Sequence, residues 1–257
     1  MRFLLLLLIP LTLLCSASVE PSPLQNHSFA SSIGYKAGDT VVTIPADIRH
    51  IPPFAFFDCK SLRHVVFPRN SKCTSIGEYA FAGCENLSEI SIPTGVTEIR
   101  EGTFRECSSL RRINLPKKLK DIKSFAFIYC ELLDSVALPQ GLTHIGLNAF
   151  CRDLSLSEIY IPDSVIEIES YAFADCMSLT SARLPNNSRM LGELIFNGCS
   201  SMTLLSQPSQ TPPAFDCDSF IFSPADTTAY KRCRLIVPPT AIPYYQSAQG
   251  WSLFFDN

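Results

Sequence analysis

Cysteine offers the widest choice of chemistry in this chain, because a thiol can form a disulfide, bind a metal ion or act as a nucleophile. The sequence contains 11 cysteines and 4 histidines. Six cysteines recur at nearly constant spacing: Cys59, Cys84, Cys107, Cys130, Cys176 and Cys199. Asp153 stands where this spacing would place a further cysteine. Zinc sites need closely spaced ligand pairs such as C-x-x-C. No such pair occurs, so we expect no metal site and no cofactor.

The histidines do not form a catalytic motif either. His27, His50, His64 and His144 lie outside any nucleophile elbow or metalloprotease helix motif, and we expect exposed imidazoles. Glycine-rich phosphate loops are absent from the sequence. An acidic pair for glycan or peptide hydrolysis cannot be recognised without geometry, and such a hydrolase is a minor alternative. We therefore expect that the protein is not an enzyme.

The regular spacing of the cysteines points back to the elements that position them. Prolines recur with the same rhythm, in steps of 23 residues with one step of 25, at positions 45, 68, 93, 116, 139, 162, 185 and 208. Phenylalanines follow at positions 56, 81, 104, 127, 150, 173 and 196. A fixed period in this range is typical of a leucine-rich-repeat solenoid. The sequence thus predicts about seven coils of 23 residues that share one elongated core.

Each coil reads as two short extended pieces and a compact segment. The first has the form Leu-x-x-Ile-x-Ile-Pro, where proline ends the strand because it cannot donate to a β-ladder. A second short strand follows, as in residues 96–99, and then a helical turn or tight loop such as residues 79–84. Stacked coils would place the first strands in one parallel sheet about 35–40 Å long.

This stacking decides how the cysteines are interpreted. Cysteines in successive coils point in parallel, which is poor geometry for disulfides, so we expect buried thiols that act as small hydrophobes. Cys217 and Cys233 lie after the repeats and flank a loop, where a disulfide is plausible and would contribute about 3 kcal/mol.

The chain divides into four segments. Residues 1–17 read as a secretory signal peptide, with a basic start, an apolar run and small residues near the cleavage site. The apolar run is too short for a membrane span. Acylation of Cys15 is a weaker alternative, because Leu14 precedes it. Residues 18–39 read as a flexible lead-in, 40–208 as repeats and 209–257 as a C-terminal cap rich in aromatic residues.

Strand alternation supplies the candidate binding surface. In Leu-x-x-Ile-x-Ile, the residues on either side of the middle isoleucine face away from the core and form two rows along the sheet. Arginine and tyrosine often dominate binding energy at interfaces. The candidates on these rows are His64, Glu89, Arg112, Glu158, Tyr160 and Arg183, of which Arg112, Tyr160 and Arg183 are the strongest.

The repeated phrase carries a family resemblance. The pattern Ile-Pro-x-x-Val-x-x-Ile-x-x-x-Ala-Phe-x-x-Cys-x-x-Leu-x-x-Ile-x-Ile, found over residues 40–208, resembles the BspA-like leucine-rich repeats of bacterial surface proteins. The resemblance implies a secreted or surface-exposed, non-catalytic protein that mediates adhesion by binding a protein or glycan ligand on a host or neighbouring cell. It transfers no binding residues. A structural or spacer module of a cell-envelope assembly is the alternative.

The charge distribution excludes one class of partner. The formal net charge is −3 at pH 7, and the sequence has no long run of Lys or Arg. Nucleic-acid binding requires a basic stripe that neutralises phosphates. We therefore expect no nucleic-acid partner.

Overall fold

The computed structural model describes residues 28–215, 220–223 and 226–255. The expected signal peptide, residues 18–27 of the lead-in and Cys217 lie outside these residues. The helices are α2 (Ser28–Ser32), α3 (Thr227–Arg232) and α4 (Ile242–Ser247), with 3-10 helices η1 (Pro239–Ala241) and η2 (Ser252–Phe254). The strands are β1 (Val41–Thr43), β2 (His50–Ile51), β3 (His64–Val66), β4 (Ser75–Ile76), β5 (Glu89–Ser91), β6 (Glu98–Ile99), β7 (Arg112–Asn114), β8 (Asp121–Ile122), β9 (His144–Ile145), β10 (Glu158–Tyr160), β11 (Glu167–Ile168), β12 (Ser181–Arg183), β13 (Met190–Leu191), β14 (Leu204–Ser206), β15 (Ala214–Phe215) and β16 (Arg234–Ile236).

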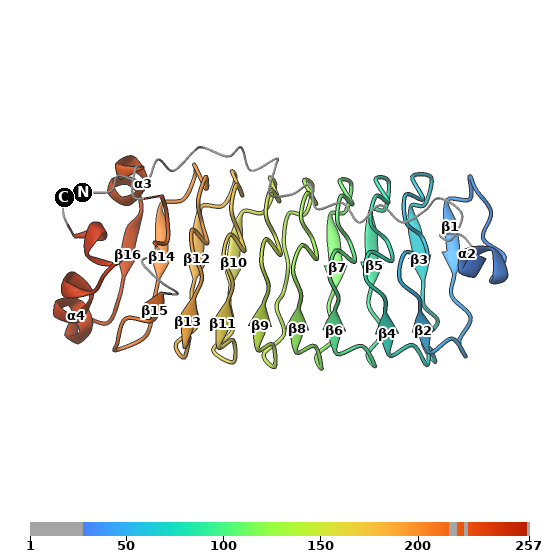
Figure 1. Cartoon of the computed structure of the whole chain (residues 1–257), viewed down its shortest axis with the longest axis horizontal. Helices are drawn as coiled ribbons and strands as arrows, with labels where there is room; N and C mark the ends of the chain where they lie inside the picture. Colours follow the sequence, from blue (N-terminus) through green and yellow to red (C-terminus); the bar gives the residue numbers. More distant parts are fainter. Residues whose placement is uncertain (1–27, 216–219, 224–225, 256–257) are drawn as a thin grey trace, which may run out of the picture.

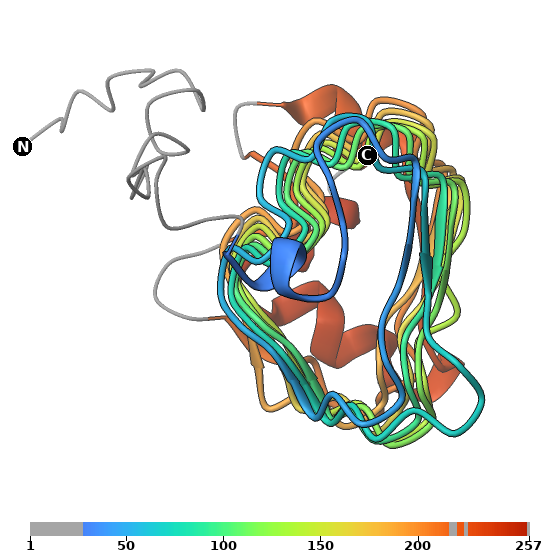
Figure 2. The same cartoon turned by 90° about the vertical axis from the view of Figure 1, so that its right-hand side faces the viewer.

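These strands form the predicted parallel solenoid. Figure 1 shows them in two rows, with the three-residue strands of successive coils above the two-residue strands. Every recorded strand pair is parallel, and neighbouring coils inside the repeat are usually offset by 23 residues, as in Glu158↔Ser181. Viewed along the stack, the coils superimpose closely around a common interior (Figure 2). The repeat spacing therefore predicted the fold class correctly.

The expected single outer sheet is interrupted. One four-stranded sheet has the order β1-β3-β5-β7 and a second has the order β10-β12-β14-β16. Residues 133–137 lie between them and form no strand, so the two outward rows that alternation predicted are broken in this coil. Ser135 Oγ instead donates to Asp134 Oδ1 at 2.8 Å, a local bond of the kind that competes with regular structure.

The compact segments are stacked turns and contain no helix. In the fourth coil, Phe125 (φ 59°) and Tyr129 (φ 64°) adopt left-handed backbone conformations that reverse the chain tightly. Their backbone N–H groups donate to the next coil, Phe125 to Leu147 O at 2.8 Å and Tyr129 to Cys151 O at 3.0 Å. These bonds pair the backbone N–H and C=O groups of turns that form no regular helix or strand.

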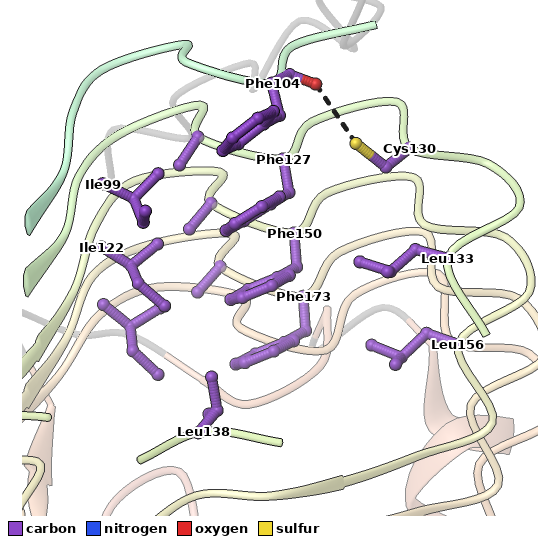
Figure 3. Packing of buried hydrophobic residues seen from close by; sticks show 14 of the residues in the cluster. Ile99, Phe104, Ile122, Phe127, Cys130, Leu133, Leu138, Phe150, Leu156 and Phe173 are labelled. Atoms are coloured by element: carbon purple, nitrogen blue, oxygen red, sulfur yellow. Dashed lines mark hydrogen bonds between the residues drawn. The ribbon is translucent and has the colours of Figure 1, made fainter. Parts of the chain in front are cut away.

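A ladder of phenylalanines fills the core beneath these turns. Phe104, Phe127, Phe150 and Phe173 lie one above another, with isoleucines on one side and leucines on the other (Figure 3). All ring centroids from Phe56 to Phe196 follow one another at 5.0–5.6 Å, and each ring is fully buried. Burial of one such side chain contributes roughly 1.5–3 kcal/mol.

The ladder cysteines do more than fill space. The Cys130 thiol donates to the carbonyl of Phe104 at 3.2 Å, across the stack of coils (Figure 3). The same bond recurs at 3.1–3.2 Å for Cys84, Cys107, Cys176 and Cys199. The expectation of inert small hydrophobes was therefore incomplete. Burial also raises the pKa of the Cys84 and Cys130 thiols, which favours their protonated form.

Asp153 replaces a cysteine in this ladder and is fully buried. Its Oδ1 accepts from the backbone N–H of Cys130 at 3.0 Å. Its Oδ2 is buried and has no hydrogen-bond partner among the described residues. Burial raises the pKa of the Asp153 carboxyl well above its usual range, which favours the neutral acid.

Both ends of the ladder are covered. At the N-terminal end, α2 and the following loop place Phe29 and Tyr35 edge-on against Phe56. Residues 28–32 of the expected flexible lead-in are therefore helical. At the C-terminal end lies a buried aromatic cluster that includes Phe222, Tyr245 and Trp251, with the indole N–H of Trp251 donating to Pro213 O at 3.1 Å.

Candidate ligand-binding surface

The six candidate residues lie on the three-residue strands of the outer sheets. Strands β3, β5, β7 and β10 have an exposed–buried–exposed pattern, so their first and third residues face outward. The interruption at residues 133–137 divides the candidates into two groups. His64, Glu89 and Arg112 lie on one sheet, and Glu158, Tyr160 and Arg183 on the other.

The first group lines a shallow hollow. His64, Glu89 and Arg112 occupy matching positions on β3, β5 and β7, because His64 pairs with Glu89 and Glu89 with Arg112. The hollow has a volume of about 580 Å³. It is lined by His64, Val65, Val66, Phe67, Glu89, Ile90, Ser91, Arg112 and Asn114.

Arg112 is the uncommitted donor of this hollow. Its side chain is exposed and makes no hydrogen bond or ion pair with any described residue, although Glu89 is its neighbour in the sheet. Beside it, Asn114 Nδ2 donates to Ser91 Oγ at 2.8 Å. Val66 supplies an apolar surface that is 43% exposed. An unpaired guanidinium can bind a carboxylate through two parallel hydrogen bonds.

The second group is already engaged within the chain. Tyr160 and Arg183 are partners in the β10–β12 ladder, and the Arg183 guanidinium lies over the Tyr160 ring at 4.6 Å from its centroid. Arg183 also forms an ion pair with Asp163 at 2.9 Å. The hydrogen bond from Arg183 lowers the pKa of the Asp163 carboxyl. Glu158 is exposed on the same sheet face.

Sequence reasoning underrated the apolar part of the hollow. Val66 and Asn114 stood on the expected outward row, but only charged and aromatic side chains were given weight. Phe67 follows the strand and was missed, because strand alternation does not place a residue beyond the strand end. The sequence places Val66 and Phe67 directly after His64 and Val65, and this apolar pair beside a candidate residue could have drawn attention to the hollow.

The remaining chemical expectations have different outcomes. Cys233 is buried, and burial raises its pKa to about 12. The bridge to Cys217 stays a prediction because Cys217 lies outside the described residues. Among the histidines, His50 and His64 are exposed, whereas His144 is partly buried and pairs with Glu169 at 2.7 Å. Within the described residues, no helix is long and apolar enough to cross a membrane.

Known proteins with similar sequences and structures are repeat proteins. The model of the BspA type leucine rich repeat region matches with six copies over residues 27–154 and 126–220. Among solved structures, a T. pallidum leucine rich repeat protein shows 30% identity over 70% of this chain and 75% of its own, with a TM-score of 0.51. A leucine-rich repeat protein from Bacteroides ovatus shows 23% identity over 83% of this chain and 65% of its own, with a TM-score of 0.47. None of the curated proteins matches the chain.

Proteins of this kind are generally repeat scaffolds that bind other proteins and carry out no catalysis. The matched repeats extend from α2 through β15 and cover most of the chain. The identity with the T. pallidum protein agrees with this assignment. The chain therefore belongs to the BspA-type leucine-rich repeat family.

Proposed function

We propose that this chain is a secreted or surface-exposed adhesion protein that binds a protein ligand through the outward face of β3, β5 and β7. The observation that carries the proposal is the side chain of Arg112, which is exposed, charged and without a partner in the described chain. It adjoins the exposed apolar surface of Val66 in one hollow. A charged donor beside an apolar patch fits a protein segment that presents a carboxylate next to an apolar side chain.

The two candidate groups now differ in weight. Arg183 already holds Asp163 and stacks on Tyr160, so binding a ligand would first require these contacts to break. Arg112 has no such contacts to lose. We therefore assign the ligand contact to the first group, with Arg112 as its central residue and His64 and Glu89 at its side.

The spacer alternative receives less support. Assembly through the stacked ends would need exposed end faces, but Phe29 and Tyr35 cover one end of the phenylalanine ladder. At the other end Trp251 is fully buried. Substitution of Trp251 therefore tests folding of the cap and not contact with another molecule.

The experiment compares the chain lacking residues 1–17 with three single variants on a panel of matrix proteins, mucins and bacterial surface glycans. Arg112→Glu reverses the charge in the hollow. Arg189→Glu makes the same change at an exposed residue outside the hollow and serves as the matched control. Tyr160→Ala tests the second group.

Binding that Arg112→Glu lowers at least tenfold, while Arg189→Glu and Tyr160→Ala retain it, supports the proposal. A tenfold loss corresponds to about 1.4 kcal/mol of binding free energy. Equal binding by parent and Arg112→Glu, with unchanged thermal unfolding, rejects the assignment to this face. Binding only to glycans would keep the face and replace the class of ligand.

A further inference from the structure

A second cluster of functional groups lies on the row of two-residue strands. His144 on β9 and Glu167 on β11 are register partners in neighbouring coils. Glu169 follows Glu167 by two residues. One ligand atom from each of the three side chains lies within 4.8 Å of those of the other two. Among the described residues, this is the group of histidine, cysteine and acidic side chains that is arranged closely enough to hold a metal ion.

The backbone of Leu147 and the imidazole of His144 hold Glu169 in place. Its Oε1 lies 2.7 Å from His144 Nε2, and its Oε2 accepts from the backbone N–H of Leu147 at 2.8 Å. Gly146 occupies the equivalent position one coil earlier and has no side chain in this space. A Cβ at Gly146 would lie 2.5 Å from the backbone nitrogen of Ser124, so close packing of the coils keeps a larger residue out.

In two earlier coils, the positions equivalent to Glu167 and Glu169 carry residues of opposite charge. Three coils before Glu167, Glu98 pairs with Arg100 at 2.8 Å, and in the following coil Asp121 lies 3.6 Å from Lys123. Each carboxylate there has a basic residue two positions later on the same strand face. At Glu167 the residue two positions later is Glu169, a second acid. Within the described part of the chain, neither glutamate of this cluster pairs with a lysine or arginine, and the ion-pair partner of Glu169 is the imidazole of His144.

The cluster also contains polar atoms without a partner among the described residues. The Nδ1 atom of His144 is buried and has no hydrogen-bond partner among the described residues. Glu167 is exposed and forms no ion pair with them. A hollow of about 260 Å³ lies over the two glutamates and is also lined by Leu147, Ser170, Met190 and Gly192. His144 does not line this hollow, which adjoins the cluster on the side of the two carboxylates and opens that side to solvent.

We propose that His144, Glu167 and Glu169 form a binding site for a divalent transition-metal ion of the zinc type. One imidazole nitrogen with two carboxylate oxygens is a zinc donor set, whereas magnesium and calcium take oxygen ligands almost entirely. Ligands at ~2.1 Å from a tetrahedral ion lie about 3.4 Å apart. Rotation of the exposed Glu167 side chain supplies this approach, while the Leu147 N–H orients Glu169 as an outer hydrogen bond does in known metal sites.

The ion would add a link between two coils that already meet through strand pairing and stacked phenylalanine rings. It would replace the His144–Glu169 hydrogen bond by bonds to both β9 and the segment that contains β11. Binding to the native state alone stabilises a protein in proportion to the logarithm of ligand concentration. The proposal therefore predicts zinc-dependent thermal stability as well as binding.

The test titrates ZnCl₂ into tag-free, metal-free protein by calorimetry and repeats the titration with Co²⁺, whose visible spectrum reports the coordination geometry. Glu167→Gln removes an exposed ligand without disturbing the core. His144→Gln removes the imidazole. Glu98→Gln makes the same change as Glu167→Gln at the corresponding position three coils earlier, where Arg100 already neutralises the carboxylate, and is the matched control.

We expect one saturable site that raises the melting temperature, with affinity lowered at least tenfold by Glu167→Gln and by His144→Gln and retained by Glu98→Gln. We also expect Co²⁺ to give the intense visible bands of a tetrahedral site. Absence of saturable binding would overturn the assignment. An equal loss in all three variants, or binding that survives both Glu167→Gln and His144→Gln, would show that any ion sits elsewhere.

Discussion

Replacing Asp153 by cysteine should stabilise the protein, although it exchanges the residue that the chain naturally carries. In the other coils the equivalent thiol donates to a phenylalanine carbonyl, as Cys130 does to Phe104 at 3.2 Å. Asp153 accepts one hydrogen bond through Oδ1, while its buried Oδ2 has none among the described residues. Asp153→Cys would remove this atom and supply a thiol directed at the carbonyl of Phe127.

The size of the effect follows from two contributions. A buried polar atom without a partner costs about 1–3 kcal/mol, and a restored hydrogen bond contributes roughly 0.5–1.5 kcal/mol. The pKa of Asp153 is raised in the folded state, so the folded state binds the proton more tightly than the unfolded state. Its contribution to stability is complete below the unfolded pKa of about 3.9 and is lost as pH rises toward the folded pKa, by ~1.4 kcal/mol for each unit.

The assay is thermal and urea unfolding of parent and variant under reducing conditions at several values between pH 4 and pH 8. Asp153→Cys should gain about 1–3 kcal/mol near pH 4, and its advantage should grow as pH rises. A gain of 1 kcal/mol corresponds to about 2–4 °C in melting temperature for a chain of this size. Asp134→Cys makes the same exchange at an exposed residue and should have little effect. An advantage that does not grow with pH would refute a buried neutral acid.

Three further outcomes follow from the packing. Phe127→Ala should cost about 3–5 kcal/mol, because it opens a cavity between two stacked rings, and hydrogen exchange should show the loss in both neighbouring coils. Gly192→Ala should destabilise by about 1–3 kcal/mol in urea unfolding, since its Cβ would lie 2.2 Å from the backbone nitrogen of Ser170. The thiols of Cys84 and Cys130 should resist a disulfide reagent at pH 8 until denaturant is added, because burial raises their pKa and blocks access.

The repeat period allowed the parallel strands and the phenylalanine ladder to be predicted, because both depend only on residues about 23 apart being neighbours. The interruption at residues 133–137 could not be predicted, since Leu133 and Val136 fit the apolar pattern and the difference lies in local hydrogen bonds. The hydrogen bonds from the cysteine thiols to phenylalanine carbonyls depend on where each turn directs its carbonyl groups, and residue type alone does not determine this.

The outward strand face and the cluster at His144 differ in how much of each could be predicted from the sequence. Alternation placed Arg112 and Arg183 on the outward face, but only contacts show that Arg183 is engaged by Asp163 and Arg112 is not. The cluster at His144 was missed because ligand spacing was judged along the chain. In a solenoid, residues 23 apart are adjacent, and His144 and Glu167 could have been paired by that rule. The hydrogen bond from the Leu147 N–H to Glu169 could be found only from coordinates.

The two rows of strands are interrupted at different coils. The outer sheets separate between β7 and β10, whereas the row of two-residue strands separates between β4 and β6 and continues from β6 through β15. The breaks in strand pairing in the two rows therefore lie at different coils. Any plane that parts the stack must break strand pairing on one side or the other, in addition to parting stacked phenylalanine rings. A repeat array with aligned breaks would fracture into independent halves, whereas this one should resist bending and lose its structure as a single cooperative unit.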